Sequence, residues 1–382
     1  MAITPPDKIP TWATNETNNS DPGAAKQAAG WSTNEAPSSG HINWLLNGMG
    51  GFIELFANTL KPQMAFWNTD FTANSPFGSI TTYHITYLDT FQKWYAVTLQ
   101  SGAAKAYEST DGVTWGSAKT LKASGASGIS QWAEDGTNLY VAVDDTVYSS
   151  TGAVASLSSD STFADITAVV GLTWDETNGV LIGAGAGPSF DRIETKNGAG
   201  SWTVRTTVAT STVVSLATNS SGKSVCTTDA SEVFYTVNPE GGTWSTSTPP
   251  SILGGIIWSP SVGVFVATNS AHSMYFSDTG ASFTDSGFDA YQIIENGEFL
   301  YAIGDKTTQD GEMRAYKQFQ PSNAAVNHFD FATVGFRDYN NESDNAASSF
   351  YSANTFQGGQ GRMVWLWDTG EKLAVSRFGA SS

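Results

Sequence analysis

Short apolar runs separated by polar turns recur along most of the chain, with a period near 42 residues. Six of these runs are strand cores, and their successive starts lie 45, 41, 44, 40 and 36 residues apart. The cores begin at Trp94, Leu139, Val180, Ser224, Val264 and Leu300. A second landmark is an aromatic or aliphatic residue further along each repeat, found at Tyr107, Tyr148, Ile193, Tyr235, Tyr275 and Tyr316. Because two independent landmarks share one period, the pattern indicates an internal structural repeat.

Each repeat contains more than one strand. A turn-rich link precedes every strand core, and its residues can adopt positive φ or bind their own backbone. Another apolar strand precedes most of these links, for example at His84, Gly171 and Gly255. Three or four strands in about 42 residues match one blade of a β-propeller and are too many for one coil of a β-helix. The pattern therefore predicts an all-β fold with a six-bladed propeller over residues 63–320, and a degenerate seventh blade stays open.

The N-terminal region, residues 1–62, has a different character. Its first forty residues are rich in Asn, Ser, Thr, Pro and Ala, which predicts an extended arm. Trp12 and Trp31 in this arm dock either on the chain's own surface or on another protein. Residues 42–60 predict a short helix, because its apolar residues recur at steps of three and four. Such a helix covers either the propeller or copies of itself in an oligomer.

The period stops after Phe319, and residues 321–382 form a separate C-terminal β-segment. Strand-like pieces run from His328 to Phe336, from Met363 to Trp367 and from Leu373 to Phe378. This segment either closes the propeller, forms a small β-domain or joins identical segments of neighbouring chains. Both faces of the strand around Trp365 are apolar, which favours a place in a core or an interface.

Composition and charge narrow the function classes. The 382 residues are 40% hydrophobic and only 14% charged, and the net charge is −18. An acidic chain is a poor partner for nucleic acid, because phosphate binding needs Lys and Arg. Cys226 is the only cysteine, which excludes an intramolecular disulfide and a zinc site built on cysteines. We expect no signal peptide and no membrane insertion, because the chain has neither a basic start followed by an apolar core nor an 18-residue apolar run.

Several repeats contain a turn in which a Ser or Thr, an Asp or Asn, a Gly and an aromatic residue follow one another. The clearest runs from Ser109 to Trp115, and the next from Ser277 to Phe283. More divergent copies span 195–202 and 236–244. These turns resemble the Asp-box of sialidase-like propellers, a resemblance that implies a folding motif between the outer strands of a blade. The Asp or Asn binds amides within the turn, Gly takes the left-handed conformation and the aromatic ring packs on the blade.

The same resemblance raises the question of enzymatic activity. A sialidase of that kind implies an arginine cluster, a Tyr nucleophile with a Glu partner and a further acidic residue. Only Arg192, Arg205 and Arg314 lie in the predicted propeller, and none precedes the first blade. We therefore predict that the chain is not an enzyme, and we assign no catalytic residue, although sequence alone does not reveal paired carboxylates of a glycan hydrolase.

Metal and cofactor sites are equally unsupported, and none is assigned. The histidines do not have the spacing of a metal site; they are His41, His84, His272 and His328. Asp144 and Asp145 form an isolated acidic pair, which we interpret as a solvated turn in preference to a calcium site.

A second resemblance concerns the N-terminal region. Pro10 and Trp12, then Gly30 and Trp31, then Pro37, Asn43 and Trp44 follow the order seen at the start of many tailed-bacteriophage tail proteins. The resemblance covers about 60 residues and implies a virion-attachment segment. This chain has no long shaft, which favours a compact appendage or an adaptor over a long fibre.

Together these observations predict a phage virion structural protein of the tail, made in the host cytoplasm and acting by binding. Its expected partners are other tail proteins and either a host-surface glycan or a host-surface protein, and it is expected to form homo-oligomers, trimers by analogy with the family. A structural adaptor or decoration protein without host binding, and a glycan hydrolase or depolymerase, stay as alternatives.

Overall fold

The computed structural model describes residues 77–260, 262–271 and 273–289, followed by seven strand segments: 292–295, 300–303, 313–316, 328–330, 357–359, 362–367 and 372–375. The chain divides into two compact units, Met1–Asn68 with Phe378–Ser382, and Thr69–Arg377. Every described residue belongs to the second unit. The predicted arm and helix of residues 1–62, including Trp12 and Trp31, lie outside the described residues.

The first three blades are four-stranded antiparallel sheets. Blade 1 contains β1 (Thr82–Leu88), β2 (Lys93–Gln100), β3 (Ala103–Ser109) and β4 (Lys119–Lys122). Blade 2 contains β5 (Ala133–Glu134), β6 (Leu139–Val143), β7 (Thr146–Ser150) and β8 (Ser158–Thr162), with the short 3-10 helix η3 (Val154–Ser156) between its last two strands. Blade 3 contains β9 (Ala168–Asp175), β10 (Val180–Ala186), β11 (Asp191–Asn197) and β12 (Thr203–Val208).

Two further blades repeat the same order, and a larger sheet completes the unit. Blade 4 contains β13 (Val213–Thr218), β14 (Ser224–Thr228), β15 (Val233–Thr236) and β16 (Ser245–Ser247). Blade 5 contains β17 (Leu253–Ser259), β18 (Val264–Asn269), β19 (Ser273–Ser277) and β20 (Thr284–Asp289). Blade 6 contains β21 (Gln292–Glu295), β22 (Leu300–Ile303), β23 (Met313–Tyr316) and β24 (His328–Asp330).

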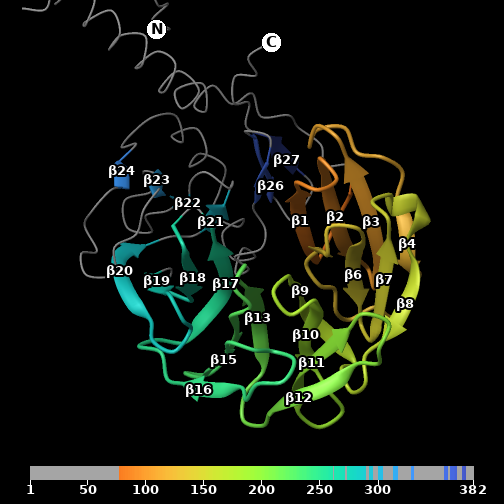
Figure 1. Cartoon of the computed structure of the whole chain (residues 1–382). Coiled ribbons are helices and arrows are strands. Elements are labelled where there is room, and N and C mark those ends of the chain that lie inside the picture. Colours follow the sequence, from red (N-terminus) through yellow and green to blue (C-terminus); the bar gives the residue numbers. More distant parts are fainter. Residues whose placement is uncertain are drawn as a thin grey trace, which may run out of the picture. The chain divides into compact units, whose positions relative to one another are not determined.

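Three C-terminal strands extend the sheet of blade 6. They are β25 (Gln357–Gly359), β26 (Arg362–Trp367) and β27 (Lys372–Val375), and they pair antiparallel in that order. β25 pairs in parallel with β21 at Glu295 and Gln357, and it also contacts β1. The strands β25–β27 therefore lie between the sixth blade and the first (Figure 1).

The repeat pattern of the sequence agrees with these sheets, and the predicted all-β propeller is confirmed. The six predicted strand cores begin or lie within β2, β6, β10, β14, β18 and β22, the second strand of each blade. The apolar strands predicted before the turn-rich links are the first strands, such as β1, β9 and β17. Within the described residues no helix is long and apolar enough to cross a membrane.

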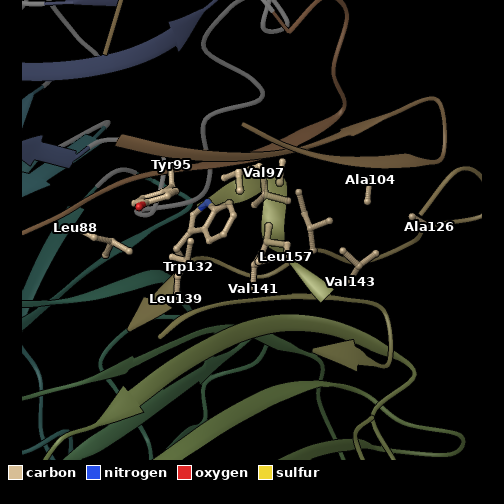
Figure 2. Close-up of a cluster of buried hydrophobic side chains, with 13 residues drawn as sticks. Leu88, Tyr95, Val97, Ala104, Ala126, Trp132, Leu139, Val141, Val143 and Leu157 are labelled. Atoms are coloured by element: carbon tan, nitrogen blue, oxygen red, sulfur yellow. The ribbon is translucent and has the colours of Figure 1, made fainter. Parts of the chain in front are cut away.

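Hydrophobic cores fill the spaces between consecutive blades. One cluster joins Leu88, Tyr95 and Val97 of blade 1 to Trp132, Leu139 and further residues of blade 2 (Figure 2). Similar clusters join blades 2 and 3, 3 and 4, 4 and 5, and 5 and 6. Strands that are buried on both faces read as nearly continuous apolar runs, which is why Leu139–Val143 consists of aliphatic residues and one tyrosine. Each blade therefore depends on its neighbours for its core.

The inner edge of blade 2 departs from the regular pattern. β5 contains only two residues, and Ile129 forms an isolated bridge with Val143 before it. Gly128 lies so close to the backbone of Val169 in blade 3 that a Cβ atom there would overlap with it. A glycine is needed at this close approach, and residues 128–130 contact blade 3 while they also pair with β6 of their own blade.

Candidate functional site

In blades 2 and 3, a carboxylate within the turn holds the turn between the first and second strands. In blade 2, Asp135 accepts hydrogen bonds from the amides of Thr137 and Asn138 at 2.8 and 2.6 Å, and from the Tyr140 hydroxyl at 2.7 Å. These bonds lower the pKa of Asp135, although burial opposes the shift. Blade 3 repeats the arrangement, with Asp175 accepting from Thr177 and Asn178. The shared Asp-x-Thr-Asn sequence therefore stabilises the turn through hydrogen bonds from the Thr and Asn amides to the Asp side chain.

The turns between the third and fourth strands are stabilised in a similar way. Asp111 Oδ1 accepts the amides of Val113 and Thr114 at 2.8 and 2.7 Å, and Ser109 Oγ accepts the amide of Gly112 at 2.9 Å. The indole of Trp115 donates to the Gly112 carbonyl at 3.1 Å. Gly112 has a φ of 72°, the left-handed conformation that the sequence predicts there.

The three related turns share parts of this network. Asn238 Oδ1 accepts the amide of Gly241 at 3.0 Å, and Ser277 Oγ accepts the amide of Gly280 at 2.8 Å. In blade 3 the backbone carbonyl of Asn197 accepts the amide of Gly200 at 2.8 Å. The side chains of Asp111, Asn238 and Ser277 bind amides of their own turns, whereas the Asn197 side chain donates to Glu240 in the neighbouring turn.

The interpretation of Asp144 and Asp145 as a solvated turn is wrong for Asp144. Only 4% of Asp144 is exposed, whereas Asp145 is exposed. Asp144 Oδ1 accepts the amides of Ser127 and Gly128 at 2.8 Å each, and Oδ2 receives a hydrogen bond from Lys122 at 2.5 Å. These partners lower the pKa of Asp144, although burial opposes the shift. The carboxylate therefore fixes the segment that enters blade 2, a role that needs distant residues and was invisible in the sequence.

The two arginines whose side chains the structure describes have separate partners. Arg192 pairs with Asp165 at 3.3 Å, and Arg205 donates to the hydroxyl of Thr195 at 2.6 Å. Both arginines belong to the outer strands of blade 3, and Arg314 belongs to β23 of blade 6. In the part of the chain that the structure describes, no group of three or more His, Cys, Asp or Glu residues could hold a metal ion.

The two histidines in the described residues lie in different blades. His84 is buried in β1, and burial lowers its pKa to about 4, partly opposed by a hydrogen bond to the backbone of Ile129. His328 lies in β24, and His41 and His272 fall outside the described residues.

The junction of blades 1 and 2 contains three buried polar atoms without a hydrogen-bond partner: His84 Nδ1, Trp132 Nε1 and Glu134 Oε2. We call this group the blade 1–2 junction. Trp132 packs against Tyr95 with ring centroids 5.4 Å apart, and Figure 2 shows the two rings side by side. Buried polar atoms are nearly always paired in native proteins, so this junction differs from the turns described above.

The Glu134 carboxyl is the partly buried acidic group of this junction. Burial raises its pKa, a hydrogen bond from Thr90 opposes the shift, and the negative charges of Asp89 and Asp135 add to it. Asp89 and Thr90 belong to the turn that follows β1 and are exposed. The neighbouring Asp135 carries the opposite shift. Sequence reasoning missed this site, because Glu134 has the appearance of an ordinary turn residue.

A polar contact near the junction reaches further around the ring. The Gln131 amide donates from Nε2 to the carbonyl of Leu216 in β13 at 3.0 Å, whereas its Oε1 has no partner. Gln131 precedes the inner strand of blade 2, and Leu216 lies in the inner strand of blade 4. The inner edges of blades 2 and 4 are therefore in direct contact.

Comparisons with known proteins support the fold. No family model matches the chain, and no curated protein sequence matches it either. Among solved structures, a chain from the Mitotic Checkpoint Complex has a TM-score of 0.55 at 13% identity, covering 82% of this chain and 95% of that one. The Cps50 (Swd1) β-propeller domain of Myceliophteria thermophila has a TM-score of 0.52 at 9% identity, covering 81% and 99%.

A third similar structure is YCF48 bound to D1 peptide, with a TM-score of 0.50 at 14% identity over 82% of this chain and 95% of that one. At these identities the likeness concerns the fold alone. Propellers support many unrelated functions, so function has to be argued from the residues of this chain.

Proposed function

We propose that this chain is a phage virion structural protein of the tail, which acts by binding a host-surface glycan or protein through its propeller. The observation that carries the proposal is the N-terminal order of Pro10, Trp12, Gly30, Trp31 and Asn43 ahead of a propeller. That order resembles the attachment segment of tail proteins, and residues 1–62 would attach the propeller to other tail proteins. The turns that resemble the Asp-box would then serve as rigid supports for the blades.

The internal bonding of the turns supports a binding role. Their carboxylates accept amides of the same turn, as Asp111 and Asp135 illustrate. Side chains held in this way keep a surface in one shape, and a preorganised surface binds with less loss of entropy. The blade 1–2 junction is the part of this surface that we assign to ligand contact, because Asp89 and Glu134 lie there beside buried polar atoms without partners.

Binding of purified protein to host cells and to their isolated surface polysaccharide tests the proposal. We expect saturable binding without release of reducing ends. The paired variant Asp89→Asn with Glu134→Gln is expected to weaken binding. The matched control is Asp145→Asn, an exposed acidic residue in the second turn of blade 2. Absence of saturable binding to cells and polysaccharide would favour the alternative of a structural adaptor or decoration protein, and a fixed symmetric position on the particle would support that alternative.

A glycan hydrolase is the second candidate, and the environment of Glu134 favours it specifically. Glycoside hydrolysis needs one carboxyl with a raised pKa as the acid and a second, ionised carboxylate nearby. Glu134 has the raised pKa, and Asp89 and Asp135 are the carboxylates whose charges act on it. Asp135 is occupied by its turn, so Asp89 would be the partner.

Release of reducing ends from the polysaccharide distinguishes the two candidates. If release is observed, Glu134→Gln should abolish it with retention of polysaccharide binding. Persistence of release in both Glu134→Gln and Asp89→Asn would exclude this pair of carboxylates as the active site.

A further inference from the structure

Two Asn-Gly dipeptides in the described residues have different surroundings. They are Asn178-Gly179, in the turn between β9 and β10, and Asn197-Gly198, in the turn between β11 and β12. The same dipeptide at Asn47 and Asn296 lies outside the described residues. Gly179 and Gly198 both have positive φ, 67° and 49°, so the two glycines are comparable in backbone conformation.

Both the side chain of Asn178 and the backbone amide that follows it are hydrogen-bonded. Its Nδ2 donates to Asp175 Oδ2 at 2.6 Å, and the amide of Gly179 donates to the Asp175 carbonyl at 2.9 Å. The turn between β13 and β14 of blade 4 also packs against this side chain, because Gly222 lies next to Asn178 and Asp175. The side chain and the following amide of Asn178 are therefore both fixed.

At Asn197 the side chain is hydrogen-bonded but the backbone amide that follows it is not. It is exposed, as are the three residues that follow it. Its Nδ2 donates to Glu240 Oε1 at 2.7 Å, a contact between the outer turns of blades 3 and 4. The amide of Gly198 has no acceptor among the residues that the structure describes, so it is free to lose its proton to water.

We infer that Asn197 is a site of spontaneous deamidation in the folded protein and that the fold protects Asn178. The Gly198 nitrogen loses its proton and attacks Cγ of Asn197, which forms a C–N bond and closes a five-membered succinimide. The Cγ–Nδ2 bond breaks, and ammonia leaves with the proton. Water then opens the ring at either carbonyl, which gives aspartate or isoaspartate and places one oxygen of water in the product.

The conversion changes the contact between the outer turns. The amide donor that binds Glu240 becomes a carboxylate, and two negative charges then face each other across a contact that was a hydrogen bond. Isoaspartate also lengthens the backbone by one methylene beside the pairing of Thr195 with Thr203. The modified protein should therefore have looser outer turns in blades 3 and 4 while the inner strands stay in place.

Incubation of the full-length protein in heavy-oxygen water at mildly alkaline pH, followed by peptide mapping, tests the inference. We expect the label at Asn197 to accumulate several-fold faster than at Asn178 in the folded protein, and the two rates to converge in urea. The variant Asn197→Gln, whose longer side chain closes a ring far less readily, should remain unlabelled at position 197. An equal or faster rate at Asn178 in the folded protein would overturn the inference. Protection of both sites in the folded protein, with labelling only in urea, would overturn it as well.

Discussion

Two neighbouring junctions of the propeller differ in how fully their buried polar groups are hydrogen-bonded. Between blades 2 and 3, Glu194 is fully buried and accepts the amides of Ala164, Asp165 and Ile166 at 2.7, 2.7 and 2.8 Å. The Trp202 indole at the same junction donates to the hydroxyl of Ser161. Every polar group named here has a partner, so this junction joins the two blades firmly.

Between blades 1 and 2, a glutamate and a tryptophan each have one buried polar atom without a partner, although Glu134 also receives a hydrogen bond from Thr90. Glu134 Oε2 and Trp132 Nε1 are buried and unpaired, and so is Nδ1 of His84. Trp132 belongs to the hydrophobic cluster that joins the two blades. An unpaired buried polar group lowers stability, and three of the seven such atoms in the described part of the chain lie at this junction. The difference is the reason why we place the candidate site between blades 1 and 2.

The largest expected effect tests the junction of blades 2 and 3. Glu194→Ala leaves three amides without their acceptor, and we expect the free energy of unfolding to fall by about 3 to 5 kcal/mol. Urea unfolding followed by tryptophan fluorescence measures the loss. A loss no larger than that of Glu134→Ala would remove the distinction between the two junctions.

The second effect concerns acid sensitivity at the junction of blades 1 and 2. Burial lowers the pKa of His84 from 6.5 to about 4. The unfolded chain therefore binds a proton at a higher pH than the folded protein, and stability is full above pH 6.5 and is lost as the pH falls towards 4. His84→Gln should remove about 3 kcal/mol of this loss. Unfolding at a series of pH values, for wild type and variant, tests this; parallel profiles would contradict it.

Two ion pairs of equal length provide the third comparison. Lys196–Asp160 and Lys122–Asp144 both have N–O distances of 2.5 Å, but the side chain of Lys196 is 7% exposed and that of Lys122 is 41% exposed. Lys196→Met should cost about 2 kcal/mol, whereas Lys122→Met should cost about 1 kcal/mol or less, because water screens an exposed lysine and Asp144 keeps its backbone partners. Equal losses in the two variants would show that burial does not govern these pairs.

The smallest effect belongs to Glu134. Because its pKa is raised in the folded protein, the protonated form is favoured there, and stability is present at low pH and lost as the pH rises through the folded pKa. Glu134→Gln should therefore be as stable as wild type at neutral pH, or more stable by less than about 1 kcal/mol, since the group is partly exposed and screened. A clear loss in the same urea assay would mean that the hydrogen bond from Thr90 to this carboxylate stabilises the fold.

The sequence by itself determined the repeat. Its period, the six strand cores and the position of the turns follow from alternation of apolar and turn-forming residues, which is local information. The internal bonding of turn residues such as Asp111 and Asp135 was predictable for the same reason, because each side chain binds amides two or three residues away.

Only the tertiary structure decided what the polar residues of the junctions do. Asp144 and Asp145 are adjacent in the sequence, yet one is buried on amides of a distant segment and the other is exposed. Glu194 binds amides of the loop between β8 and β9, whereas one oxygen of Glu134 has no partner, and the sequence distinguishes neither residue. Partners far apart along the chain leave no periodic signal, because contacts between blades depend on how the sheets are arranged around the ring.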